Sequence, residues 1–213
     1  MWQIIPQVFY DLLARAVPGA LLLFGAASVA AGPTAAARFV VQPPAGCEPF
    51  GLGGVLLWAL GSYATGIVIG QFWEYAFGWH TRRLQKRFEE EVRPKCLAEH
   101  NALQIALGKT PVSVKPSDLP RTFVMRDHLR YLAPAEGLRL LKVRAERRGA
   151  EVLLLGLGLL AATNGVWLAL DRTAERLVLE IVLLAGVAAF FRMARRLRKM
   201  LITGTVVSFL QAV

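Results

Sequence analysis

The chain has 213 residues, of which 55% are hydrophobic and 19% are charged, and its formal net charge is +10. The charges are clustered between long uncharged stretches, whereas a soluble amphipathic helix places a charge every turn or two. Because a membrane span needs about 20 predominantly apolar residues, this composition disfavours a soluble globular domain and predicts an all-α membrane protein.

Four stretches of the chain predict transmembrane helices, at about 12–32, 51–73, 152–170 and 174–191. The first is followed by small residues, as in a secretory signal, but the segment before it holds one base and one acid and so lacks a positive n-region. We therefore interpret it as a span. The fourth is the weakest of the four, because its sequence contains Glu180.

Lysine and arginine predict the orientation of these spans. Sixteen of them, against eight acids, lie between residues 80 and 148, and five more lie in 192–199, whereas 33–50 contains only Arg38. Bases beside spans are retained on the cytoplasmic side, so both termini and the 80–149 segment are predicted to face the cytoplasm of a bacterial inner membrane. The aromatic residues after the second span would then form its cytoplasmic interfacial belt: Trp73, Tyr75, Phe77 and Trp79.

The predicted organisation has four parts: spans one and two within 1–79, a cytoplasmic basic helical hairpin at 80–149, spans three and four within 150–191, and a basic cytoplasmic C-terminal tail at 192–213. Apolar residues recur every four positions from Leu84 to Cys96, which predicts that span two continues as a helix, with a break or kink at Pro94. The proline-rich stretch GKTPVSVKPSDLP ends that helix. A new helix beginning at Pro134 is expected to continue into span three.

Small residues recur at helical spacing in two of the spans: Ser62, Gly66 and Gly70 in the second, and Gly158 and Ala162 in the third. Such residues let helix backbones approach closely where lipid supplies no hydrophobic drive for association. We favour packing inside one four-helix bundle as their role. The alternative is an interface between the subunits of a homo-oligomer.

Three polar residues within the spans or at their ends are candidates for function, because such groups are costly in a bilayer. Asn164 lies near the middle of span three, where we expect either one interhelical hydrogen bond or a ring of asparagines lining a pore. Glu180 is predicted to pair with Arg176, four residues earlier. Glu74, at the end of span two, is expected to reach a base on a neighbouring helix.

The cytoplasmic bases predict a basic surface comprising Arg82, Arg83, Lys86, Arg87, Arg144, Arg147, Arg148, Arg195, Arg196 and Arg198. Acids are interleaved with these bases, and no RNA-binding signature appears. We therefore attribute the bases mainly to membrane topology and to contact with the anionic lipids of the bilayer. A cytosolic protein, or a nucleotide or oligonucleotide, is the alternative partner.

No catalytic or cofactor-binding motif occurs in the sequence. The three histidines form no HExxH pattern, and there is no GxSxG motif and no phosphate-binding loop. Cys96 and His100 share a helix face, but two ligands do not make a zinc site. The sequence therefore predicts no catalytic residue, no metal and no cofactor, and we do not expect an enzyme.

Three segments, FYDLLARAVPGALLL, GSYATGIVIGQFWEY and KVRAERRGAEVLLLGLG, give the chain an architecture that resembles small bacterial inner-membrane proteins with four spans and a cytoplasmic helical insert. Some members of that class act as effectors or sensors in antiphage defence. The resemblance covers most of the chain. It implies oligomerisation and a response to a cytoplasmic signal by permeabilising the membrane, and it assigns no functional residue.

Three functions agree with these features. The first is a homo-oligomer whose cytoplasmic helices sense a ligand or partner and control a pore or membrane disruption. The second is a non-conducting anchor that recruits a cytosolic protein or nucleic acid through the 80–149 segment. The third is a small transporter with Glu74 or Glu180 as its proton site. Ion conduction by the purified chain separates the first function from the second.

Overall fold

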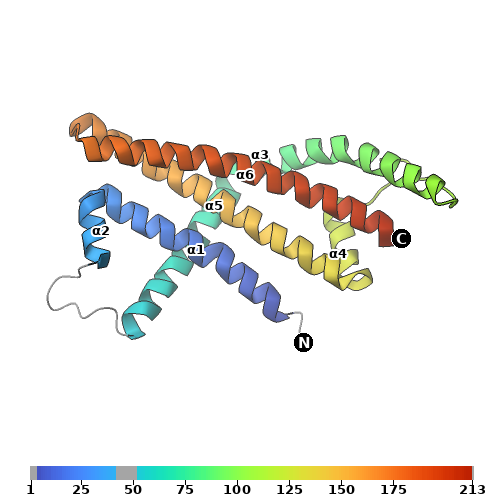
Figure 1. The fold of residues 1–213 in the computed structure, drawn as a ribbon, viewed down its shortest axis with the longest axis horizontal. Coiled ribbons are helices and arrows are strands. Elements are labelled where there is room, and N and C mark those ends of the chain that lie inside the picture. The colour runs from blue at the N-terminus through green and yellow to red at the C-terminus, as the bar shows by residue number, and fades with distance from the viewer. Residues whose placement is uncertain (1–3, 42–51, 213) are drawn as a thin grey trace. The chain divides into compact units, whose positions relative to one another are not determined.

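The computed structural model describes residues 4–41 and 52–212 (Figure 1). Within these ranges the chain forms helices and no strand, which confirms the predicted all-α class. The helices are α1 (Ile4–Ala31), α2 (Pro33–Val41), α3 (Leu52–Ala106), α4 (Thr122–Leu132), α5 (Pro134–Leu170) and α6 (Ala174–Ala212).

Four of these helices, α1, α3, α5 and α6, are long and apolar enough to cross a membrane. Helix α3 has 55 residues, α5 has 37 and α6 has 39, whereas a span needs only about 20. Each of these three helices therefore carries an apolar segment and a further polar segment without a break. The four candidate spans are the ones that the uncharged stretches of the sequence predict.

Glycine and proline set several of the helix ends. Gly32 follows the last residue of α1 with a φ of +89°, and Gly108 follows α3 with a φ of +70°. This left-handed conformation is the usual way for a helix to end, and glycine adopts it without strain. Pro33 and Pro134 are the first residues of α2 and α5, where a helix needs no backbone N–H donor.

The chain folds into two units. We call the first the four-span unit; it comprises Asp11–Ala76 and Arg147–Ala194. The second, which we call the basic helical unit, comprises Met1–Tyr10, Phe77–Glu146 and Arg195–Val213. Helices α3, α5 and α6 each contribute residues to both units.

The four-span unit buries small apolar clusters and leaves most of its apolar surface outside. One cluster forms around Leu22, Val152 and Leu153, and another around Val29 and Leu183. Only 28%, 11%, 33% and 11% of the most apolar segments of α1, α3, α5 and α6 are buried within the chain. Large exposed apolar faces over a few buried polar groups are what a lipid-embedded bundle requires.

Helices α1 and α3 cross at direct backbone contact within this unit (Figure 1). A Cβ placed on Gly19 would lie 2.7 Å from the carbonyl carbon of Ser62, and one placed on Gly66 would lie 2.8 Å from the carbonyl carbon of Arg15. Carbon atoms in normal contact are about 3.5–4.0 Å apart. Both positions therefore need glycine. The two contacts are four residues apart along each helix and run in opposite chain directions, so the two helices are antiparallel here.

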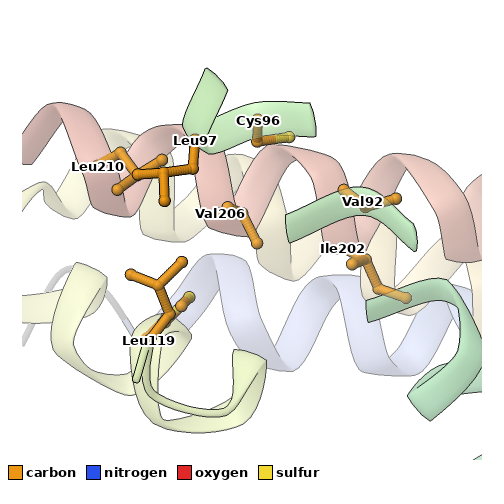
Figure 2. Close-up of a cluster of buried hydrophobic side chains, with 8 residues drawn as sticks. Val92, Cys96, Leu97, Leu119, Ile202, Val206 and Leu210 are labelled. Atoms are coloured by element: carbon orange, nitrogen blue, oxygen red, sulfur yellow. The ribbon is translucent and has the colours of Figure 1, made fainter. Parts of the chain in front are cut away.

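The basic helical unit has a conventional apolar core. Figure 2 shows Val92, Cys96 and Leu97 of α3 gathered with Ile202, Val206 and Leu210 of α6, and Leu119 of the connecting segment joins them. A second cluster contains Leu129 of α4, Leu140 of α5 and Leu201 of α6. Helices α3, α4, α5 and α6 thus all contribute to the interior of this unit.

The end of α6 differs from the basic tail that the sequence suggested for 192–213. Its residues are helical to Ala212, and Ile202, Val206 and Leu210 follow one another every four positions along a buried face. The run of bases before this repeat dominates the composition of the segment and hides the apolar stripe. Arg198 lies on the buried side of the helix, 6% exposed, and so does not belong to the basic surface predicted for it.

The proline-rich connection between α3 and α4 is held to α3 by polar contacts. Asn101 accepts a hydrogen bond from the backbone N–H of Val112 at 2.9 Å and donates one to its carbonyl at 3.2 Å. Near the start of α4, the Thr122 hydroxyl donates to Glu89, which also pairs with Arg93 at 3.0 Å. These contacts compensate for the backbone hydrogen bonds that prolines cannot make.

Candidate functional site

A cavity of about 90 Å³ with both apolar and charged walls lies in the four-span unit, between α1, α3 and α5. Its walls are formed by Ala14, Arg15, Gly66, Ile67, Gly70, Gln71, Trp73, Glu74, Arg148, Glu151 and Val152. Arg15 comes just before the first uncharged stretch, Glu74 just after the second and Glu151 just before the third. The cavity therefore lies where these spans end, on the side predicted to be cytoplasmic.

Two carboxylates of the cavity are paired with arginines of α5. Arg148 Nη2 lies 3.4 Å from Glu74 Oε1, and Arg147 Nε lies 3.7 Å from Glu151 Oε1. The side chain of Glu74 is 63% exposed, whereas that of Glu151 is only 8% exposed. An unpaired buried carboxylate would be costly in such a position, and Arg147 gives Glu151 a partner of opposite charge.

Small residues of α3 create the space of the cavity, because they have no side chain that would fill it. The charged side chains surround this space. Gly66, Gly70 and Glu74 follow one another every four residues, so they share one face of α3. At Gly70 an added Cβ would lie 3.5 Å from Val152 Cγ2, an ordinary contact distance. The GxxxG pair thus has two roles: Gly66 admits the backbone of α1, and Gly70 keeps the wall of the cavity open.

A second polar cluster surrounds Asn164, which is fully buried. Its side-chain nitrogen donates to the carbonyl oxygen of Arg176 at 3.0 Å and to Glu180 Oε2 at 2.9 Å. These bonds join α5 to α6. Because the chain's own atoms cover Asn164 completely, its side chain is not available to a ring of asparagines in this arrangement.

The sequence predicted that Arg176 pairs with Glu180. In the structure Arg176 contacts other groups instead. Its Nε lies 3.8 Å from Asp171, its Nη1 donates to the carbonyl of Val29 at 3.3 Å, and its guanidinium stacks over the Trp167 ring at 5.2 Å. Glu180 instead accepts the hydrogen bond from Asn164. The cluster ties α1, α5 and α6 together at the other end of the spans.

The small residues proposed in span three face away from the chain. Nothing lies within 4 Å of a Cβ added to Gly158, and Ala162 is exposed. Buried small residues of α5 include Ala161, which joins an apolar cluster, and Gly156, where an added Cβ would lie 2.8 Å from Leu22 Cγ. Within the chain, Gly158 and Ala162 therefore have no packing role.

The predicted basic residues fall into three groups. Arg82, Arg87, Arg195 and Arg196 are exposed; Arg83 stacks over Trp79 at 4.9 Å, and Lys86 lies 3.9 Å from Glu90. Arg144, Arg147 and Arg148 are half-buried, the last two in the ion pairs described above. With Arg198 buried, the exposed basic surface is smaller than the sequence suggested.

Sequence reasoning named Glu74, Gly66, Gly70 and Arg148 separately, but it did not place them at one site, and it missed Glu151. Glu151 follows Arg147 by four residues at the edge of a span, and this spacing is a signal that could have identified it. Gly19 follows Arg15 by the same interval, so the two residues share a face of α1. The sequence of α1 does not say that this face packs against α3, because the packing partner lies in another part of the chain. In the described parts of the chain, no three His, Cys, Asp or Glu side chains are close enough to hold a metal ion.

The chain matches no protein-family model, no curated protein and no solved structure. Its function must therefore be argued from its own residues.

Proposed function

We propose that this chain is a homo-oligomeric effector of a bacterial inner membrane, in which the basic helical unit receives a cytoplasmic signal and the four-span unit responds by opening a pore or disrupting the bilayer. In this proposal both termini and the basic helical unit face the cytoplasm. The signal is a ligand or a partner, either a cytosolic protein or a nucleotide or oligonucleotide. Antiphage defence is the setting that the resemblance of the sequence favours.

The continuity of three helices is the observation that carries this proposal. Helices α3, α5 and α6 each pass from one unit into the other without interruption of the helix. In such a helix the backbone N–H groups bond to the preceding turn, and Pro94, which lacks this donor within α3, lies inside the basic helical unit and not between the two units. A rotation or shift of these helices in the basic helical unit is therefore transmitted to the spans, with no flexible linker to absorb it.

The outward face of α5 supports assembly of several copies. Gly158 and Ala162 lie one turn apart on this face; a Cβ added to Gly158 would meet nothing within 4 Å, and Ala162 is exposed. In lipid, small residues of this kind let the backbone of a second helix approach closely. The low buried share of α3 also leaves its apolar face free for a neighbouring copy.

The oligomer is tested by measuring mass in lipid nanodiscs together with ion flux in liposomes that contain only this protein. Gly158→Leu is expected to reduce both the subunit number and the flux, because the added side chain fills the face where another helix would pack. Ala185→Leu is the matched control, since Ala185 is exposed on a different helix, α6. A monomer with no flux at any protein concentration would exclude the oligomeric pore.

One observation favours a second candidate, a non-conducting membrane anchor. The polar groups of the spans are used within the chain: Asn164 binds Glu180, and Glu74 pairs with Arg148. A pore needs polar groups that face water, and the exposed faces of the described spans are mainly apolar. The anchor predicts that the flux assay stays silent while the basic helical unit still recruits a cytosolic partner to the membrane.

A further inference from the structure

The depth of the cavity between α1, α3 and α5 places it among lipid headgroups. Its charged residues lie within about one turn of the points where three apolar segments end, and Trp73, an interfacial residue type, is one of its walls. Groups at this level meet the phosphate and amine of phospholipids as well as water. A cavity here is therefore open to a ligand that is already present at high concentration in the bilayer.

The walls carry both signs of charge. Glu74 and Glu151 are carboxylates, Arg15 and Arg148 are guanidinium groups, and Gln71 adds an amide. A purely anionic ligand would meet two carboxylates, and a purely cationic ligand would meet two arginines. A zwitterion satisfies both sets, because an ammonium donates to carboxylates and a phosphate accepts from guanidinium groups.

The gradient of exposure sets the direction in which such a group would enter. Glu74 and Arg148, with side chains 63% and 36% exposed, are at the mouth, whereas Glu151, at 8%, is on a buried wall. An ammonium that enters the cavity reaches Glu151, and a phosphate one short linker away remains beside Arg148. The cavity thus has charges of both signs at its mouth and a carboxylate on its buried wall.

The size of the cavity limits the occupant. A volume of about 90 Å³ equals roughly three water molecules in the liquid, far less than a pocket for a drug-sized ligand. It admits an ammonium group and its adjoining methylenes but not a whole headgroup. A trimethylammonium group is bulkier and has no N–H to donate, so it cannot replace the primary ammonium.

We propose that this cavity binds the primary ammonium of a phosphatidylethanolamine headgroup, with Glu74 and Glu151 as acceptors and Arg148 beside the phosphate. The site is independent of the proposed pore, because an anchor would contain it equally. A bound lipid at this point contacts three spans and therefore stabilises their arrangement.

Native mass spectrometry tests the proposal with the full-length protein and equal amounts of phosphatidylethanolamine, phosphatidylcholine and phosphatidylglycerol of the same acyl chains. We expect retention of phosphatidylethanolamine over phosphatidylcholine by roughly tenfold, the effect of one lost charge-assisted hydrogen bond. The preference should fall in both Glu74→Gln and Glu151→Gln. It should persist in Glu175→Gln, which changes an exposed carboxylate that contacts Thr34 and does not line the cavity.

Several outcomes overturn the proposal. Equal retention of the ethanolamine and choline lipids excludes recognition of the ammonium, and stronger retention of phosphatidylglycerol shows that the arginines alone select the lipid. An unchanged preference in Glu74→Gln excludes the cavity as the site, and this variant decides the matter if Glu151→Gln fails to fold. Equally strong binding of soluble glycerophosphoethanolamine would identify a free metabolite, and not a membrane lipid, as the ligand.

Discussion

Replacing Gly66 with alanine adds one methyl group at the point where the backbones of α3 and α1 are in contact. The new Cβ would lie 2.8 Å from the carbonyl carbon of Arg15 and 2.9 Å from its Cα. Because these are backbone atoms of a helix, no side-chain rotation relieves the overlap. Helix α1 must move away by at least about 0.7 Å to restore a normal carbon contact of about 3.5 Å.

The magnitude follows from two opposing effects. Overpacking of this kind costs about 1–3 kcal/mol, and replacing glycine with alanine inside a helix returns about 0.5–1 kcal/mol. Because the atoms met are backbone atoms that cannot rotate away, the upper half of the overpacking range applies, and the expected net loss in the free energy of unfolding for Gly66→Ala is about 1–2.5 kcal/mol. A displaced α1 should also enlarge the cavity next to it, because Gly66 and Arg15 are both among its walls.

The other glycines of the same motifs provide matched controls. At Gly70 the added Cβ meets only Val152 Cγ2 at 3.5 Å, and at Gly158 it meets nothing within 4 Å. Gly70→Ala should therefore be nearly neutral, and Gly158→Ala in the monomer should gain up to about 1 kcal/mol from helix propensity. The three substitutions are chemically identical, so they differ only in what surrounds the new methyl group.

The assay is reversible unfolding in mixed detergent micelles, followed by helical circular dichroism as the fraction of denaturing detergent increases. Dilute protein keeps any subunit interface from contributing to the Gly158→Ala result. If Gly66→Ala unfolds at the same point as the wild type, α1 and α3 do not cross at backbone contact, and the reasoning fails. A larger loss for Gly70→Ala than for Gly66→Ala would refute it equally.

Three further predictions concern the basic helical unit. Met125→Ala, at a fully buried position, should cost about 2–5 kcal/mol in the free energy of unfolding, measured by chemical denaturation; a loss below about 1 kcal/mol would mean that the core is not formed. Thr122→Val removes the hydroxyl that donates to Glu89 and should cost about 1–2 kcal/mol in the same measurement, while an unchanged midpoint would show that this contact is not formed in solution. Burial, with a smaller effect of a nearby carboxylate, raises the pKa of the Cys96 thiol, which lies outside the apolar segments, so the reactive thiolate is scarcer than in a free thiol at any pH below that raised value. In a Cys47→Ser background, maleimide labelling at pH 7.5 should be slow until the protein unfolds, and rapid labelling of the folded protein would contradict this burial.

Much of the secondary structure follows from the sequence alone. Uncharged stretches of about 20 residues identify the spans because hydropathy is a local property of composition. The ends of α1 and α3 follow from Gly32 and Gly108, and the start of α5 follows from Pro134, because glycine and proline act on the backbone of their own turn. Residues 42–51, including Cys47, lie outside the described part of the chain.

The roles of individual small and charged residues were decided only by the tertiary structure. Gly66 and Gly158 belong to similar small-residue patterns, yet one contacts a helix backbone and the other faces outward. Glu74 of α3 reaches the same cavity as Arg148 and Glu151 of α5, although more than 70 residues separate it from them in the sequence. A helical pattern states which residues share a face, but the partner of that face depends on helices elsewhere in the chain.

The end of α6 illustrates the same division. The sequence determined that 192–199 is strongly basic, and that property alone suggested a basic cytoplasmic tail. The apolar repeat at Ile202, Val206 and Leu210 acquires meaning only because Val92 and Cys96 of α3 present a matching stripe. Composition fixes where a segment can be stable, in lipid or in water, because transfer energies are properties of single residues. Contacts between distant segments fix what each residue does there, because packing energies belong to pairs.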